Sequence, residues 1–207
     1  MDNRCKKMKK LLGIVVLGLL FSSSVFAEDI SDFEIDGISL GDNLLEHYSI
    51  QEISNSFEHN YENIPYTYYV LNTKEPNSRY TRIQITIKRE NKNIIKSNDK
   101  LIIHEIAGLD YSFEKINVCH SRLNNIKNEL ESYFNSKATE DSGFSEWDET
   151  GESKFKRYHF YLNENNSYAD VVLRCNDYGK IYEKQDYDDV LSLSIYTEEY
   201  IHAISTQ

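Results

Sequence analysis

The sequence predicts an α+β protein in which a tandem helix-then-three-strands unit forms antiparallel sheets, with the helices packed on one face. Six segments alternate apolar and polar side chains, as strands do when one sheet face is buried. These segments come in two runs of three, and a helix pattern precedes each run. Strands that follow one another without an intervening helix are expected to pair antiparallel and to be covered by the helices.

The first 27 residues have the three parts of an export signal. Residues 4–10 carry five Lys and Arg, residues 11–21 are apolar but too short to span a bilayer, and Val25 and Ala27 occupy the −3 and −1 positions of a cleavage site. We expect cleavage after Ala27, a periplasmic or secreted location, and a single α+β domain over residues 28–207. No later apolar run is long enough for a membrane span in this mature chain.

The chain is acidic, with a formal net charge of −11. Removal of residues 1–27 leaves 18 basic and 33 acidic residues, a charge of −15. Nucleic acids and anionic lipid surfaces would be repelled by such a charge, so neither is expected as a partner. Basic partners are weakly favoured.

Helix signals begin after a turn at Gly37 and Gly41. Asp42 is the expected N-cap of a first short helix. Ser49 and Glu52 then form a capping-box pattern, which predicts a second short helix running toward Phe57.

The long central helix is expected to begin after a cap at Ser112. Its apolar side chains recur every three or four residues, at Ile116, Cys119, Leu123, Ile126, Leu130 and Tyr133 or Phe134. A last helix is expected from Thr197 to about Ile204, because Thr197 precedes two glutamates.

The expected strands are residues 66–72, 80–89 and 100–108 in the first run and 154–163, 168–176 and 190–197 in the second. A shift of about 88 residues overlays the two runs, which suggests an internal repeat over about 31–110 and 111–207. Chance similarity between strand-rich sequences is the alternative to duplication.

Two cysteines follow the export signal, Cys119 and Cys175. An even number in an oxidising compartment predicts one disulfide. The alternative is two separate buried thiols that pack as small hydrophobic side chains.

Two motifs suggest catalysis but lack the context that it needs. Ser39 lies in a G-x-S-x-G pattern, yet few residues precede it and no β-α-β alternation follows, so a nucleophile elbow is not expected. His104 and Glu105 begin an H-E-x-x-H pattern whose last position is Gly108, which excludes the zinc-protease motif. No catalytic, metal-binding or cofactor-binding residue is therefore assigned, and the protein is not expected to be an enzyme.

The acidic segment 137–153 interrupts the repeat and carries the candidate interaction surface, Phe144, Trp147 and Asp148. An aromatic side chain at the tip of an acidic loop could contact a partner. The alternative is that Trp147 folds back onto the domain. The abundant tyrosines offer a further possibility, a Tyr-lined groove between helix and sheet that binds a small molecule.

Three stretches carry a resemblance to a known family: "DFEIDGISLGDNLLEHYS", "LDYSFEKINVCHSRLNNIKNELESYF" and "LSLSIYTEEY". They resemble small signal-peptide-bearing proteins of AT-rich marine alphaproteobacteria, a family without an assigned activity, so no residue role is carried over. The resemblance implies export to the periplasm. More distantly, the tandem order of elements is similar to the β-lactamase-inhibitor-protein and outer-membrane-assembly lipoprotein folds, which is a fold analogy alone.

We therefore expect a non-catalytic interaction protein of the bacterial periplasm. It would bind a protein or envelope partner through a sheet face or through the Trp147 loop. The alternative function is a small-molecule binding module with a Tyr-lined groove.

Overall fold

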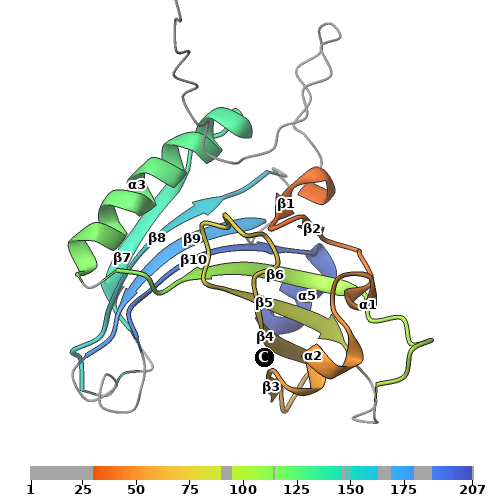
Figure 1. Cartoon of the computed structure of the whole chain (residues 1–207). Coiled ribbons are helices and arrows are strands. Elements are labelled where there is room, and N and C mark those ends of the chain that lie inside the picture. The colour runs from red at the N-terminus through yellow and green to blue at the C-terminus, as the bar shows by residue number, and fades with distance from the viewer. Residues whose placement is uncertain are drawn as a thin grey trace, which may run out of the picture.

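The computed structural model describes residues 30–89, 95–113, 115–145, 148, 150–162, 169–179 and 188–206 (Figure 1). The expected export signal, residues 1–27, lies outside this range. The elements in chain order are a 3₁₀ turn (Ile30–Asp32), β1 (Glu34–Ile35), β2 (Ile38–Ser39), α1 (Leu44–His47), α2 (Ile50–Ser54), β3 (Phe57–Asn60), β4 (Tyr66–Asn72), β5 (Arg82–Lys88), β6 (Ile103–Asp110), α3 (Ile116–Tyr133), β7 (Thr139–Phe144), β8 (Lys154–Phe160), β9 (Val171–Asp177), β10 (Val190–Tyr196) and α5 (Glu198–Ser205).

The predicted α+β class with an antiparallel sheet is confirmed. Eight strands form one sheet in the order β3-β4-β5-β6-β10-β9-β8-β7, and each neighbouring pair is antiparallel. Each half of the chain is a four-stranded meander preceded by helices, and the two meanders meet where β6 pairs with β10. A separate two-stranded sheet, β1-β2, precedes α1.

The six predicted strands correspond to β4, β5, β6, β8, β9 and β10, whereas β3 and β7 were not predicted. Both unpredicted strands form the edges of the sheet. Their sequences, "FEHN" and "TEDSGF", are exposed or half-buried on both sides and show no apolar alternation. Polar residues on an edge strand discourage pairing with other chains, and the same property hides the strand from a periodicity search.

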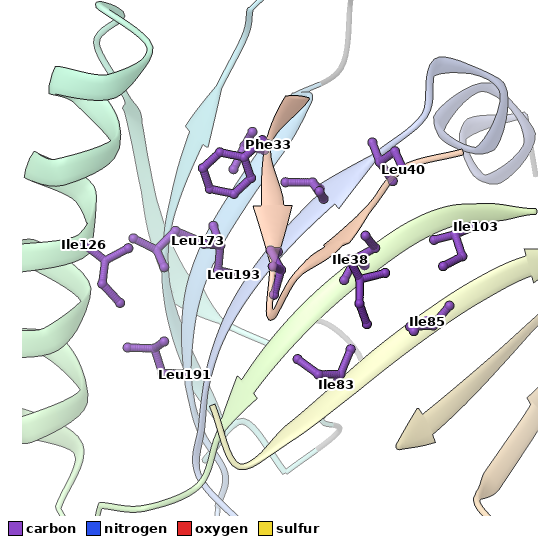
Figure 2. Close-up of a cluster of buried hydrophobic side chains, with 14 of the residues drawn as sticks. Phe33, Ile38, Leu40, Ile83, Ile85, Ile103, Ile126, Leu173, Leu191 and Leu193 are labelled. Carbon is purple, nitrogen blue, oxygen red and sulfur yellow. The ribbon is translucent and has the colours of Figure 1, made fainter. Parts of the chain in front are cut away.

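One face of the sheet carries the main hydrophobic core (Figure 2). The α3 side chains Cys119, Leu123 and Ile126 pack over β9 and β10, and the N-terminal segment β1-β2-α1-α2 packs over the first meander. Residues at alternate positions of the strands enter this core: Ile83, Ile85, Ile87, Ile103, Ile106, Leu173, Leu191, Leu193 and Ile195.

Two predicted helix caps are wrong, and in each case the predicted residue makes a different turn contact. Asn43, rather than Asp42, caps α1 by accepting from the Leu45 N–H at 3.3 Å, and it also accepts from the Leu101 N–H at 3.1 Å. Asp42 instead accepts from the Ser39 N–H at 3.0 Å, closing the turn that Gly41 permits with its φ of +87°. The capping box of α2 is confirmed.

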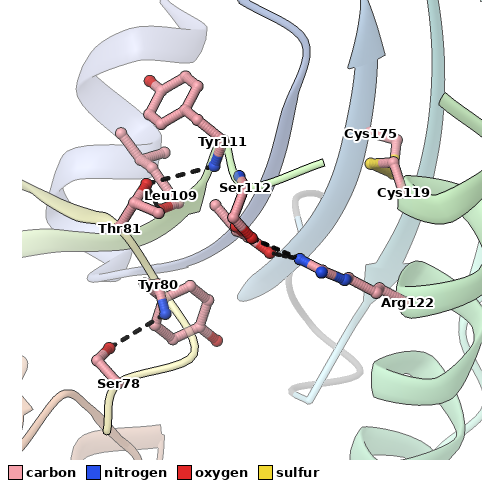
Figure 3. A network of polar contacts seen from close by, with 10 residues as sticks. Ser78, Tyr80, Thr81, Leu109, Tyr111, Ser112, Cys119, Arg122 and Cys175 are labelled. Atoms are coloured by element: carbon pink, nitrogen blue, oxygen red, sulfur yellow. Dashed lines mark hydrogen bonds and ion pairs between the residues drawn. A yellow bond between two sulfur atoms is a disulfide. The ribbon is translucent and has the colours of Figure 1, made fainter. Parts of the chain in front are cut away.

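The central helix begins at Ile116 with Lys115 at the N-cap position, which makes no side-chain cap, so the expected cap at Ser112 is absent. Ser112 instead takes part in the β6–α3 turn: its N–H donates to Asp110 Oδ1 at 2.8 Å (Figure 3). Arg122 of α3 ion-pairs with Asp110 and donates to Ser112 Oγ at 2.9 Å. A buried carboxylate thus connects the end of β6 to the side of the helix.

A bulge interrupts the pairing of β5 with β6. Thr86 pairs with Glu105, but the next residue, Ile87, pairs with Ile103, so His104 is an additional residue on β6. The bulge allows both Ile103 and Ile106 to enter the core, and it places His104 and Glu105 toward the other face.

The helices do not all lie on one face. α1, α2 and α3 cover the core face, whereas α5 packs against the opposite face at its β4–β6 end (Figure 1). No described helix is long and apolar enough to cross a membrane.

A disulfide joins Cys119 of α3 to Cys175 of β9, with Cα atoms 6.1 Å apart (Figure 3). Both residues are buried in the core, so the bond ties the central helix directly to the sheet. The predicted pairing is confirmed.

We expect reduction of this disulfide to lower the free energy of unfolding by about 2–4 kcal/mol, because the bond closes a long loop in the unfolded chain. Urea unfolding of the oxidised and reduced protein measures the difference without changing a side chain. Equal midpoints would contradict the assignment, and so would a tryptic map lacking the Cys119–Cys175 crosslinked peptide.

Candidate functional site

The face of the eight-stranded sheet opposite α3 is the candidate functional site. Directly paired residues share a face, and faces alternate along each strand. We call this surface the polar face. Its described strand residues are Phe57 and His59 of β3; Tyr66, Tyr68, Val70 and Asn72 of β4; Arg82, Gln84, Thr86 and Lys88 of β5; Glu105, Ala107 and Leu109 of β6; Val190, Ser192, Ser194 and Tyr196 of β10; Val172, Arg174 and Asn176 of β9; Phe155, Arg157 and His159 of β8; and Thr139, Asp141 and Gly143 of β7.

At the α5 end of the polar face, tyrosine side chains pack closely. Tyr200 of α5 is buried, its ring lies 4.9 Å from that of Tyr66, and its hydroxyl donates to the Tyr61 hydroxyl at 2.8 Å. Burial raises the pKa of Tyr61 and of Tyr66 to about 12. Their hydroxyls therefore remain protonated at neutral pH.

The aromatic packing continues outward to the exposed edge of the sheet. The Tyr68 ring lies 5.0 Å from His59, 5.9 Å from Tyr61 and 6.0 Å from Phe57. Phe57 is 60% exposed on edge strand β3. We call Phe57, His59, Tyr61 and Tyr68 the aromatic cluster; it presents rigid rings to solvent on the polar face.

The centre of the polar face is lined by small side chains on the two central strands. Ala107, Ser192 and Ser194 are each buried. Val70 of β4 and Tyr178, which follows β9, both pack against the group formed by Ala107, Leu109 and Val190. Contacts from strands on both sides of the centre indicate that the sheet curls toward this face.

A carboxyl group lies buried beside this centre. Glu105 is 5% exposed, accepts a short hydrogen bond from Thr86 Oγ1, and lies 3.4 Å from the Gln84 amide nitrogen. Burial raises the pKa of Glu105 above its ordinary value, while hydrogen bonds from Thr86, Gln84 and Tyr200 and the charge of Arg174 act in the opposite direction. A buried, hydrogen-bonded carboxyl is a costly feature in a sheet face that could have been filled with apolar residues.

The β8 side of the polar face combines rings with a paired cation. The rings of His159 and Tyr161 stack with centroids 6.3 Å apart. The Arg157 guanidinium lies over the Phe155 ring at 4.4 Å, and its Nε donates to Asp141 Oδ2 at 2.7 Å. Burial, together with the charge of Arg157, lowers the pKa of His159.

The candidate interaction surface predicted from the sequence lies at the β7–β8 hairpin. Phe144 is 61% exposed at the end of β7, with the Lys154 ammonium 5.6 Å from its ring centre. Trp147 lies outside the described residues. Phe144 also borders an open hollow of about 390 Å³ that includes Lys154, Asp177 and Tyr178.

Asp148, the third residue predicted for this surface, is buried and organises the hairpin turn. Its carboxylate accepts from the Thr150 N–H at 2.8 Å and from the Ser153 N–H at 2.6 Å. Burial opposes ionisation, but the hydrogen bonds from Ser153 and Thr150 hold the pKa of Asp148 below its ordinary value. These contacts give Asp148 a structural role in the described part of the hairpin.

The two catalytic near-matches are built into strands. Ser39 pairs with Glu34 in the β1-β2 hairpin, and its N–H bonds to Asp42. His104 Nδ1 lies 3.0 Å from the Thr197 hydroxyl at the start of α5. Within the described ranges, His, Cys, Asp and Glu side chains do not gather in a group of three that could hold a metal ion.

Sequence reasoning missed Glu105 and Arg174 as members of one surface. Each is a charged residue inside an otherwise apolar strand, in "LIIHEIAGL" and "VVLRCN". A charge at an alternate position of a central strand is the signal that the second sheet face is polar yet enclosed. The bulge at His104 and the pairing of β6 with β10 bring these charges to the same face, and neither can be deduced from periodicity.

The chain has no match among protein-family models, curated proteins or solved structures.

The polar face predicts a specific pH dependence of stability. Because folding holds the pKa of Glu105 above that of the unfolded chain, the folded state binds this proton more tightly, and the contribution of Glu105 to stability falls as pH rises above the ordinary value of 4.5. The Glu105→Gln variant lacks this titrating group. We therefore expect its free energy of unfolding, minus that of the unchanged protein, to be larger at pH 7 than at pH 4. Urea unfolding at both pH values measures this change.

Glu46→Gln, which removes an exposed carboxyl on α1, controls for the loss of one negative charge. A stability difference for Glu105→Gln that is the same at both pH values would rule out the raised pKa of the buried carboxyl.

Proposed function

We propose that this chain is an exported, non-catalytic interaction protein whose polar face binds a protein partner. The observation that carries the proposal is the aromatic cluster, which exposes rings on the side of the sheet that α3 leaves uncovered. The predicted export signal and the disulfide support an extracytoplasmic location, since disulfides persist in oxidising compartments.

The side chains of the polar face are those that dominate protein interfaces. Tyrosine, arginine and phenylalanine are enriched there because large, rigid rings and guanidinium groups bury much area at a small entropic cost. The aromatic cluster and the ring pair of His159 and Tyr161 stand on either side of the small-residue centre. A partner could contact both sides at once.

The Tyr-lined groove remains the second candidate function. Its support is the concentration of tyrosines near α5, but Tyr66 and Tyr200 pack against each other and are buried rather than lining an open space. The open hollow beside Phe144 includes Tyr178 as its one tyrosine among the described residues. The packing therefore favours a protein partner over a small molecule.

Two exposed phenylalanines provide a matched test. Phe57 on β3 and Phe144 on β7 are 60% and 61% exposed and lie on opposite edges of the same sheet. We expect Phe57→Ala to lose a partner that the tagged protein captures from the exported fraction of its native cells, and Phe144→Ala to retain it. Quantitative mass spectrometry of the captured proteins measures both.

Loss of the partner in Phe144→Ala with retention in Phe57→Ala would move the interaction to the β7–β8 hairpin and overturn the proposed surface. Both side chains are exposed, so neither substitution should change the free energy of unfolding by more than about 0.5 kcal/mol.

A further inference from the structure

Three arginines lie in one row across the polar face. Arg82 pairs with Leu109, Leu109 with Ser192, Ser192 with Arg174, and Arg174 with Arg157. Directly paired residues project from the same face of a sheet. The row therefore places positive charge on both sides of Ser192 in a chain whose net charge is strongly negative.

Arg157, at one end of the row, already has an anionic partner. Two of its nitrogens contact Asp141 on neighbouring strand β7, Nε at 2.7 Å and Nη2 at 2.5 Å. A second acceptor would have to compete with this carboxylate, so Arg157 contributes little net charge to the surface.

Arg174 differs from Arg157 in its contacts. It is half-buried, its Nε is enclosed, and this nitrogen has no hydrogen-bond acceptor among the described residues. The Glu105 carboxyl lies on the same face and interacts with Arg174 electrostatically, but it is hydrogen-bonded to Thr86. No hydrogen bond or ion pair within the described residues therefore neutralises the Arg174 guanidinium. An external anion that reaches its terminal nitrogens would add a charge-assisted hydrogen bond.

We propose that the polar face recognises an acidic segment of its protein partner, with Arg174 receiving a carboxylate of an Asp or Glu side chain. The guanidinium group offers its two terminal nitrogens as a planar fork that matches the two carboxylate oxygens. Arg82, which pairs with Leu109 on the same face, supplies a second cation.

The net charge of the chain does not prevent this recognition. Exposed charges more than about 8–10 Å apart are largely screened at physiological salt, so the cations nearest the bound carboxylate decide its affinity. The net charge alone favours basic partners, whereas the row of arginines favours acidic ones at this surface. The assignment of the partner's chemistry rests on the proposed function, but the carboxylate site can be tested without the partner.

The test uses the purified protein and two capped peptides, acetyl-tetraglutamate amide and acetyl-tetraglutamine amide. Each is titrated while the side-chain Nε–H signals of arginine are followed by ¹H–¹⁵N NMR. We expect the Arg174 signal to shift and saturate with tetraglutamate and to remain unchanged with tetraglutamine. Arg174→Gln should weaken tetraglutamate binding at least about tenfold, and binding should weaken as salt is raised.

Arg79→Gln is the matched control, because Arg79 forms an exposed ion pair with Glu129 of α3 on the core-face side of the sheet. It should leave the affinity within about twofold, since surface ion pairs contribute little to the fold. Arg174→Lys provides a second variant that keeps the charge, and we expect it to bind less tightly than the unchanged protein because lysine lacks the planar fork. Unfolding midpoints of all variants establish that they are folded.

Binding that is unchanged in Arg174→Gln, or equally weakened in Arg79→Gln, would overturn the site. Tighter binding of inorganic phosphate or of an oligouronate than of tetraglutamate would overturn the assignment to an acidic protein segment. Partner capture that depends on Phe57 while tetraglutamate fails to bind would refute the carboxylate site and leave the proposed function intact. Tetraglutamate binding without Phe57-dependent partner capture would refute the proposed function and leave the carboxylate site intact.

Discussion

The pairing of β6 with β10 is the constraint on which the rest of the structure depends. Six residue pairs, from Leu191–Asp110 to Tyr196–Glu105, join the two meanders into one sheet. Every residue of β6 is buried, so both faces of this central pair are enclosed. On one face Ile106 and Ile195 enter the hydrophobic core, and on the other Glu105 lies beside Tyr196. The same register therefore positions the core and the polar face.

The two faces of the sheet are stabilised by different interactions. The core face buries aliphatic side chains beneath α3 and the N-terminal segment, and the Cys119–Cys175 disulfide fixes the helix to the sheet. The polar face uses aromatic packing, hydrogen-bonded hydroxyls and a buried carboxyl. Proteins tolerate such polar burial mainly where it has a function, because apolar residues of similar size would usually be as stable. This contrast supports the assignment of binding to the polar face.

The sequence was sufficient for much of the fold. Period-two alternation located the six inner strands. Cys119 falls on the three-to-four-residue repeat of the apolar side chains of α3, so it was expected to face the sheet. The caps were less predictable, because Asp42 and Asn43 are adjacent and both are good acceptors. The hydrogen bond from the Leu101 N–H to Asn43 Oδ1, which joins distant segments, decides between them.

The proposed binding surface could be predicted from the sequence only in outline. A sheet face was expected as one possible site. Its members, however, come from eight different strands, and the bulge at His104 shifts the register between two of them. Periodicity reveals neither the strand order nor the bulge. The candidate surface at the hairpin was chosen from composition alone. Composition could not distinguish Asp148, which is buried in a turn, from Phe144, which is exposed. The placement of α5 on the opposite face likewise depends on the Tyr61–Tyr200 contact between distant segments.

The central claim is that the polar face, rather than the β7–β8 hairpin, contacts the partner. Hydroxyl-radical footprinting of the free protein and of its complex tests this claim most directly. The exposed rings Phe57 and Tyr161 flank the polar face, and Phe144 lies at the hairpin. We predict that complex formation protects Phe57 and Tyr161 from oxidation and leaves Phe144 as reactive as in the free protein. Protection of Phe144 with unchanged oxidation of Phe57 and Tyr161 would contradict the account.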